Sequence, residues 1–380
     1  MQDADSVYEE SEIRLKFRID CMKPKDTETR QEEGDGDGFA ERFGRAADLV
    51  AASGDAGRVR LTVVLIGTEV IDSVRRVIGE VMGQTRSGEL ELVLASESEG
   101  LLEAAGEWLR RDGRLGAWQL VKGDVREMAR LRLGCVVRAR GDLVVFTEDH
   151  TFQPPRWAEG LVGVFDRHPE AVAVSPCLSN PSDRTAISRV QYAFFNAGAV
   201  ARAEETGAVV VGRLPWHNTA YRTEQLRWVV GDEAMLEFEA ALQEELCRVN
   251  PGGCLMLDGG TVVGHVYMGR LWPALLMAFY GGVIVGDWLG GAWWKRGLRV
   301  VGFPVVAMRR VAGAMGELTA GPVREWAGNV VVAMVLAVVH AFGEAWGSCF
   351  GRGDAAGQYA DLETRRYRFV GAAERALLLS

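Results

Sequence analysis

The stretch that decides the fold class is "LTVVLI", residues 61 to 66, followed at once by "GTEVIDSVRRVIGEVMGQT", residues 67 to 85. The first part is an unbroken apolar run of strand length, rich in β-branched residues. The second part predicts an amphipathic helix, because its apolar residues recur at i, i+3, i+4, i+7 and i+8. These residues are Val74, Val77, Ile78, Val81 and Met82. A buried strand that leads into an amphipathic helix is the start of a β-α unit.

The same alternation continues along the chain. Further short apolar runs are separated by segments with helical periodicity, and they read "LELVLA" (90 to 95), "AWQLV" (117 to 121), "DLVVF" (142 to 146) and "AVAVS" (171 to 175). Strands that alternate with helices predict βαβ units with right-handed crossovers. We therefore expect an α/β fold with a mostly parallel sheet flanked by helices, and ligands at the carboxyl ends of its strands.

Composition and charge exclude several classes of protein. The formal net charge of −9 and the acidic pI near 5.3 give no general attraction for nucleic acid, so we expect no nucleic-acid partner. The six cysteines are scattered without a CxxC pair, which argues against a zinc ribbon and a disulfide scaffold. Reduced thiols of a cytosolic protein are the expected state.

The distribution of charged and apolar residues divides the chain into four expected regions. Residues 1–57 are charged and poor in periodic apolar positions, so we expect a poorly ordered tail that ends in a short helix near residues 39–52. Residues 58–270 form the predicted catalytic domain. Residues 271–350 form an apolar helical region, and residues 351–380 are expected to be a C-terminal tail.

The apolar region predicts contact with a membrane surface. Its longest uninterrupted apolar run, residues 330 to 339, is ten residues long, whereas a helix needs about 20 to cross the hydrocarbon core. Aromatic and cationic residues cluster nearby, as in segments that lie at a bilayer surface. They are Trp288, Trp293, Trp294, Lys295, Arg296, Arg299, Arg309 and Arg310. The alternative is a soluble helical subdomain packed on the sheet.

The polar residues of "FTEDH", residues 146 to 150, follow directly on a predicted parallel strand. Glu148, Asp149 and His150 therefore lie where such sheets bind ligands. Carboxylates and imidazole are competent ligands for Mg²⁺ or Mn²⁺. The alternative is a solvated strand end in which the aspartate caps a helix.

Three segments together carry a resemblance to a known family. "RLRLGCVVRARGD" (130 to 142) leads into the acidic cluster, "TFQPPRW" (151 to 157) follows it, and "LPWHNTAYRTEQL" (214 to 226) comes later. In this order they resemble family 2 glycosyltransferases, which have the GT-A fold. The resemblance extends over residues 60 to 270. Glu148, Asp149 and His150 stand in place of the family's Asp-x-Asp motif, as in a subgroup with Glu-Asp-His.

The resemblance implies transfer of a sugar from a nucleotide-diphosphate sugar to an acceptor hydroxyl, with inversion. A divalent cation, Mg²⁺ or Mn²⁺, would assist the departing diphosphate, and a carboxylate would accept the hydroxyl proton. Asp149 and Glu239 are the catalytic residues that it implies, with Glu237 as a second candidate for the base. Both glutamates could instead belong to the wet face of an ordinary amphipathic helix.

The resemblance also implies the binding residues. The expected metal ligands are Glu148, Asp149, His150 and His265; without the resemblance, a histidine among valines is more often a core residue. His217 is expected as an acceptor-side contact. The residues expected to bind the donor and to line its site are Gly67, Thr68, Glu69, Ser96, Glu97, Asn218 and Arg222.

The expected partners are a nucleotide-sugar donor, a glycan, lipid-linked or small-molecule acceptor, and a membrane surface. We expect a peripheral or monotopic enzyme on the cytoplasmic side of a bacterial cell membrane. A catalytically inactive, membrane-associated scaffold of the same fold is the alternative. A metal-dependent hydrolase or phosphotransferase has no signature of its own here, since HExxH, GxxxxGK[ST] and GxSxG are all missing from the sequence.

Overall fold

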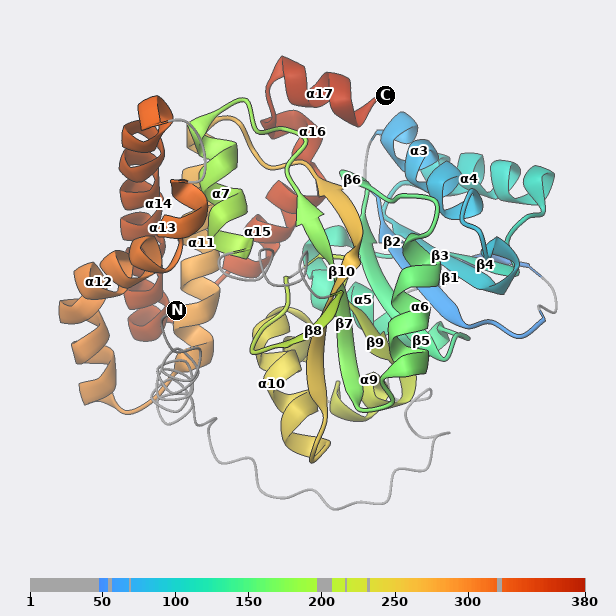
Figure 1. Cartoon of the computed structure of the whole chain (residues 1–380), viewed down its shortest axis with the longest axis horizontal. Coiled ribbons are helices and arrows are strands. Elements are labelled where there is room, and N and C mark those ends of the chain that lie inside the picture. Colours follow the sequence, from blue (N-terminus) through green and yellow to red (C-terminus); the bar gives the residue numbers. More distant parts are fainter. Residues whose placement is uncertain are drawn as a thin grey trace.

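One mixed sheet of ten strands forms the centre of the computed structural model (Figure 1). The structure describes residues 48–53, 57–67, 70–196, 207–215, 217–230, 233–319 and 323–379. The strands are β1 (Asp48–Ala52), β2 (Leu61–Ile66), β3 (Leu90–Ser96), β4 (Ala117–Lys122), β5 (Leu143–Glu148), β6 (Thr151–Phe152), β7 (Ala171–Ser179), β8 (Ala208–Val211), β9 (Ala220–Arg222) and β10 (Cys254–His265). They lie in the order β1-β4-β3-β2-β5-β9-β7-β10-β6, and β8 pairs with β10.

Helices of the catalytic domain connect and cover these strands. They are α3 (Ile71–Met82), α4 (Glu99–Asp112), α5 (Met128–Arg138), α6 (Trp157–Arg167), α7 (Ala186–Asn196), α9 (Thr223–Val229) and α10 (Glu239–Val249), with short 3₁₀ turns η1 (Ser87–Glu89), η2 (Val125–Glu127) and η3 (Glu233–Leu236). The later helices are α11 (Leu271–Leu289), α12 (Trp293–Gly313), α13 (Met315–Leu318), α14 (Val323–Phe350), α15 (Ala355–Thr364), α16 (Arg366–Phe369) and α17 (Ala372–Leu378).

The predicted α/β fold class is confirmed. Strands β4, β3, β2 and β5 are parallel neighbours, and β7 and β10 run in the same direction as these four. The pattern did not predict β9, which enters between β5 and β7 in the opposite direction. It is too short for periodicity to reveal, because only Ala220, Tyr221 and Arg222 belong to it.

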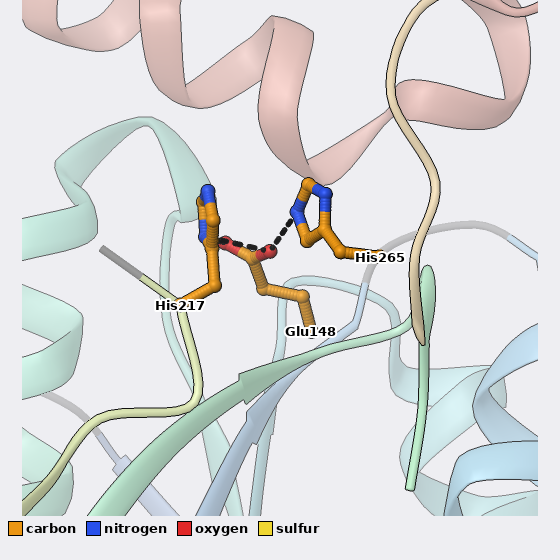
Figure 2. Close-up of side chains that lie close together, drawn as sticks. All are labelled: Glu148, His217 and His265. Carbon is orange, nitrogen blue, oxygen red and sulfur yellow. Dashed lines mark hydrogen bonds and ion pairs between the residues drawn. The ribbon is translucent and has the colours of Figure 1, made fainter. Parts of the chain in front are cut away.

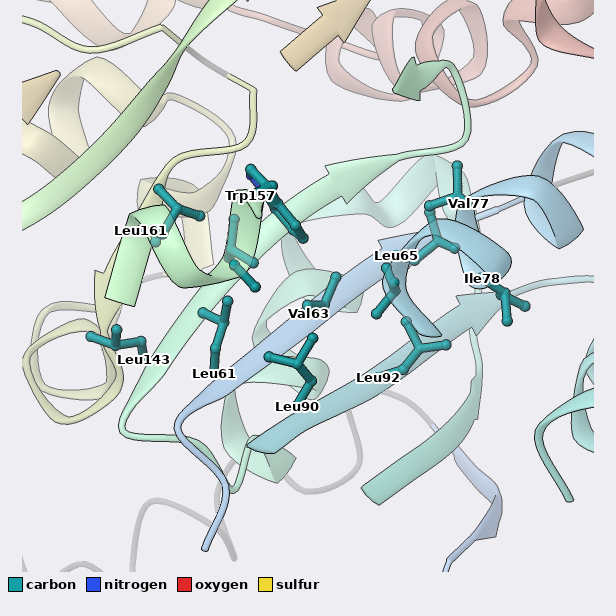
Figure 3. Packing of buried hydrophobic residues seen from close by; sticks show 14 of the residues in the cluster. Leu61, Val63, Leu65, Val77, Ile78, Leu90, Leu92, Leu143, Trp157 and Leu161 are labelled. Atoms are coloured by element: carbon teal, nitrogen blue, oxygen red, sulfur yellow. The ribbon is translucent and has the colours of Figure 1, made fainter. Parts of the chain in front are cut away.

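Each face of the sheet has its own apolar core. On β2, Leu61, Val63 and Leu65 point to one face, where they pack with residues of α3, α4 and α6 (Figure 3). Val64 and Ile66 point to the other face, against α5, α9 and α10. Burial on both faces explains why "LTVVLI" is continuously apolar rather than alternating.

The N-terminal region differs from its prediction where the structure describes it. Residues 48–52, expected at the end of a short helix, form the edge strand β1, which pairs antiparallel with β4. Pairing with an exposed sheet edge therefore outweighs the local helical pattern. Residues 1–47 and 54–56 lie outside the described residues.

Helices α11 and α14 of the apolar region pack closely through glycines. A Cβ placed on Gly282 would lie 2.1 Å from the carbonyl oxygen of His340, and one on Gly347 would lie 2.1 Å from that of Val283. Only hydrogen fits at these contacts, so the two backbones touch. Both helices are long and apolar enough to cross a membrane by length and composition, with mean hydropathy 1.3 and 1.8, and a third of each apolar window is buried.

The C-terminal segment is not the tail that the sequence suggested. It forms α15, α16 and α17, and α15 lies between α11 and the beginning of α5 (Figure 1). Its apolar side chains are buried against the end of β10 and against α11, including Leu362, Val370 and Leu378. These apolar positions are spread over three short helices, so no single run with helical periodicity predicted them.

Candidate functional site

Two histidines converge on one carboxylate at the carboxyl edge of the sheet. Glu148 is the last residue of β5, His265 is the last residue of β10, and His217 lies in the loop before β9. Nδ1 of His217 is 3.1 Å from Glu148 Oε1, and Nε2 of His265 is 3.3 Å from Glu148 Oε2 (Figure 2). The two imidazole rings stack with their centroids 4.2 Å apart.

A second group shares the same glutamate. Nε2 of His150 lies 2.9 Å from Glu148 Oε2 and 3.7 Å from Oε2 of Glu363, a residue of α15. In each group, Glu148–His217–His265 and Glu148–His150–Glu363, one potential ligand atom from each residue lies within 4.8 Å of the others. Glu148 is therefore the centre of a cluster to which β5, β10, the loop before β9 and α15 all contribute.

Asp149 takes a supporting position in this cluster. Its carboxylate lies 3.2 Å from Nδ1 of His150 and accepts a weak hydrogen bond of 3.5 Å from the hydroxyl of Ser73. A carboxylate on one ring nitrogen fixes the orientation of an imidazole and directs the other nitrogen. Here the directed nitrogen is Nε2 of His150, which faces Glu148 and Glu363.

The protonation states within the cluster suit ligand binding. Burial opposes the charge of Glu148, but His217 and His150 outweigh this effect and hold the pKa of Glu148 well below its usual range. Burial and the neighbouring His217 lower the pKa of His265 well below its usual value. Burial and Arg366 also act against charge on His150, yet the carboxylates of Glu148 and Asp149 leave its pKa raised. An ionised carboxylate and neutral imidazoles are the forms that bind metal ions, so Glu148 and His265 are ready to bind, whereas His150 would give up a proton when an ion binds.

Buried polar atoms without hydrogen bonds support a fit to a cation. Among the described residues, Nε2 of His150 and Oε1 of Glu363 are buried and make no well-aligned hydrogen bond, and both residues belong to the second group. Nε2 of His217 and Nδ1 of His265 are also unpaired, but they are the ring nitrogens that do not face Glu148. Such atoms are rare in native structures and call for a partner. Imidazole together with carboxylate is a donor set for Mn²⁺ and other transition metals more than for Mg²⁺.

Glu239 lines a pocket together with residues of this cluster. It is the first residue of α10, its side chain is buried, and Glu148, His217 and Arg132 line the same pocket. Burial raises the pKa of Glu239 to about 7, although Arg132, 3.7 Å away, and His217 act in the opposite direction. Oε2 of Glu239 accepts no hydrogen bond from the described residues. A carboxylate with a pKa near neutrality, facing a pocket, has the properties of a general base.

Glu237, the second candidate for the base, lines the same pocket but is differently placed. Its carboxylate forms an ion pair with Arg352, from the segment between α14 and α15. Its side chain is partly exposed, whereas Glu239 is shielded. Burial therefore favours Glu239 as the base.

On the donor side, only part of the predicted set falls within the described residues. Gly67 follows β2, and a Cβ there would lie 2.6 Å from Cγ2 of Val74, so the chain passes too close to α3 for a side chain. Thr68 and Glu69 lie outside the described residues. The hydroxyl oxygen of Ser96 accepts a hydrogen bond from the backbone of the following turn. Glu97 forms an ion pair of 2.7 Å with Arg365.

Asn218 and Arg222 were both expected at the donor site, but they lie at opposite ends of β5. Asn218 has a left-handed backbone (φ 59°), and its side-chain oxygen accepts a hydrogen bond of 2.9 Å from Thr147, beside the cluster. Arg222 instead pairs in register with Leu143, the first residue of β5, at the strand end opposite Glu148. Its guanidinium donates to the backbone carbonyl groups of Ala171 and Pro169. The structure therefore does not bring Arg222 to the site.

Sequence reasoning did not anticipate several residues that line the site. Arg132 and Glu363 were not predicted, and His217 was expected only on the acceptor side. One signal was present, since the chain has only five histidines and three of them meet at Glu148. For Glu363 no local signal exists, because only the docking of α15 brings it to His150.

Comparisons with known proteins give a similarity of fold. No protein-family model and no curated protein matches the sequence. Among solved structures, the chain is similar to GalNAc-T7 with UDP, GalNAc and Mn²⁺, at 17% identity and a TM-score of 0.41, over 56% of this chain and 44% of that one. It is similar to S. aureus TarS 1-349 with UDP, at 12% identity and a TM-score of 0.43, over 82% of this chain and 91% of that one. It is also similar to the mannosyltransferase PcManGT from Pyrobaculum calidifontis with GDP-Man and Mn²⁺, at 16% identity and a TM-score of 0.41, over 90% and 91%. At such low identities and TM-scores, these similarities carry no argument about the reaction of this chain.

Proposed function

We propose that the protein is an inverting glycosyltransferase that moves a sugar from a nucleotide-diphosphate sugar to an acceptor hydroxyl. The observation that carries this proposal is the pairing of two opposite chemical functions at one pocket. An ionised glutamate surrounded by histidines lies at one wall, and the buried Glu239, with a pKa near 7, lies at another. Group transfer from a diphosphate needs a group that stabilises the negative charge of the departing diphosphate, and it needs a proton acceptor.

The cluster around Glu148 would hold a divalent cation. Glu148, His217 and His265 offer one carboxylate and two imidazoles within 4.8 Å of one another, and Asp149 orients His150 beside them. A cation bound there supplies positive charge for the departing diphosphate. The ring of His217 stacks on that of His265, which holds both donors toward Glu148 before any ligand arrives.

The proposed proton acceptor is Glu239. Glu239 would accept the proton of the acceptor hydroxyl at one carboxylate oxygen while Arg132 holds the other side of the group. Its burial excludes water from the carboxylate, so that the acceptor rather than solvent is deprotonated. Glu148 and Glu239 line the same pocket from different elements, so one bound donor could contact both groups.

Turnover of nucleotide sugars tests this function directly. We expect release of nucleoside diphosphate from at least one UDP-, GDP- or dTDP-sugar in the presence of Mn²⁺, and none after chelation. Asp149→Asn should lower this rate about 10- to 100-fold, because His150 loses the group that orients it. Absence of turnover with every donor, together with no Mn²⁺-dependent thermal shift, would instead support the inactive scaffold.

We further propose that the apolar helices attach the enzyme to the cytoplasmic surface of a bacterial membrane. Helix α12 exposes an apolar stripe whose members recur at helical spacing, namely Leu298, Val301, Val305 and Met308. Lys295 and Arg296 lie in the first turn of the same helix, and Arg309 lies near its end. An apolar stripe flanked by cations fits a surface of anionic lipid.

Binding to vesicles distinguishes this attachment from a merely soluble subdomain. Val301, 82% exposed, contributes up to about 1.5 kcal/mol when its side chain enters lipid, which is about tenfold in affinity. We therefore expect Val301→Glu to weaken flotation with phosphatidylglycerol vesicles about tenfold or more. Val210→Glu, on the exposed face of β8, is the matched control and should float like the unmodified protein. Equal flotation of both variants would contradict attachment through α12.

A further inference from the structure

We infer that the group Glu148–His150–Glu363 binds a divalent ion, with Glu363 delivered by the C-terminal segment, so that the ion fastens α15–α17 to the end of β5. The inference rests on the proposed function, because the group shares Glu148 with the proposed metal site. Glu363 belongs to α15, a helix that comes after the catalytic domain and the apolar helices in the sequence. Its carboxylate nevertheless forms a potential ligand group with Glu148 and His150.

One oxygen of Glu363 is available for a ligand. Its side chain is only 8% exposed, and Oε2 is engaged by the guanidinium of Arg366. Oε1 is buried and makes no well-aligned hydrogen bond within the described residues, although the Tyr359 hydroxyl interacts with the same carboxylate. Oε2 also lies 3.7 Å from Nε2 of His150. A buried carboxylate oxygen without a partner costs free energy, which a cation at this position would offset.

Arg366 fixes the carboxylate in place. Its buried guanidinium donates a hydrogen bond of 2.6 Å to the carbonyl oxygen of Val266, the residue that follows His265. The Glu363–Arg366 pair is therefore anchored to the end of β10, the strand that carries one of the other ligands. Three carboxylates surround His150, namely Glu148, Asp149 and Glu363, and Arg366 balances the charge of one of them. A divalent ion would balance the remaining charge.

Two ion pairs that link the C-terminal region to the catalytic domain are more exposed. Asp354 pairs with Arg126 at 2.5 Å, and Arg365 pairs with Glu97 at 2.7 Å, in both cases with partly or largely exposed side chains. Exposed ion pairs contribute little to stability, whereas a buried metal ligand contributes more. Docking of the segment should therefore tighten when the ion binds, and the ion should bind more weakly when the segment is released.

Hydrogen exchange with Mn²⁺ as the probe tests this coupling without any need for activity. In the full-length protein, Mn²⁺ should slow amide exchange across residues 355–379. Glu363→Gln should lower Mn²⁺ affinity about 10- to 100-fold in calorimetric titration and remove this protection. Asp361→Asn is the matched control, because Asp361 lies on the same helix and pairs with Arg365 but belongs to neither ligand group.

Each outcome has a defined meaning. Unchanged exchange of residues 355–379 on addition of Mn²⁺ to the unmodified protein would overturn the inference, even if the variant fails to fold. Sugar transfer together with full Mn²⁺ affinity in Glu363→Gln would also overturn it, while the proposed function would stand. Protection that is lost only in Glu363→Gln, without turnover of any donor, would support the ligand and reject glycosyl transfer.

Discussion

Glu148→Gln is expected to abolish Mn²⁺-dependent sugar transfer. The carboxylate of Glu148 belongs to both potential ligand groups, so its replacement removes the one donor that no other residue can supply. The amide has nearly the same shape as the carboxylate but carries no charge. Its NH₂ group would also face ring nitrogens that contact a carboxylate oxygen in the unmodified protein. We expect Mn²⁺ affinity to fall by at least about 100-fold and transfer to fall with it. Calorimetric titration and initial rates at saturating Mn²⁺ measure the two effects.

A second glutamate provides a matched control for this variant. Glu170 also contacts a histidine, His168, at 3.1 Å, but this pair lies on the surface. Glu170→Gln should leave Mn²⁺ affinity and transfer unchanged. Retention of Mn²⁺ binding in Glu148→Gln, with a normal circular dichroism spectrum, would exclude Glu148 as a ligand.

Glu239→Gln should lower the rate constant of transfer about 10²- to 10⁴-fold while donor binding persists, because it removes only the proton acceptor. The unmodified enzyme should also show a characteristic pH profile. With the pKa of Glu239 raised to about 7 by burial, the base is protonated below this pH. The kcat/KM should therefore rise with pH and level off above about 7, and the residual activity of the variant should lack this rise.

The same group predicts a pH-dependent stability that needs no substrate. An unfolded chain releases the Glu239 proton near pH 4.5, whereas the folded protein retains it up to about pH 7. Between these values the folded state binds more protons, so the free energy of unfolding falls as pH rises. The full difference corresponds to roughly 3 kcal/mol. Relative to the unmodified protein, Glu239→Gln should therefore become more stable on going from pH 5 to pH 8 in urea unfolding.

Glu244→Gln is the control for both measurements. Glu244 lies on the same helix but is only partly buried and is not among the residues that line the pocket beside Glu148. It should keep the transfer rate and show a smaller change of stability with pH. A full transfer rate in Glu239→Gln would shift the role of base to Glu237, which lines the same pocket.

The sequence predicted those features that depend on neighbours along the chain. Continuous apolar strands and amphipathic helices identified the α/β sheet, and the polar residues after "LVVF" identified its functional edge. Glu148 and His150 could be placed because they belong to one strand end. His265 was located by resemblance, since a histidine among valines carries no local signal of its own.

Features that depend on tertiary packing were not predictable in this way. Arg222 was expected near the ligand, but the antiparallel direction of β9 carries it to the opposite end of β5. Residues 48–52 form a strand only because β4 offers them a free edge. The contact of Glu363 with His150 depends on the packing of α15 against α11 and η2, which the local sequence "ETRRYRF" cannot predict.

The late position of Glu363 in the chain has a consequence for biosynthesis. The sheet residues that carry Glu148, His217 and His265 leave the ribosome before α15 is made, and N-terminal units generally fold first. A nascent chain can therefore acquire a folded sheet while Glu363 is still untranslated. A product that terminates early, just after residue 350, would keep the strands that carry Glu148 and His265 yet lack Glu363, so the cluster around Glu148 would stay incomplete until synthesis had passed that codon.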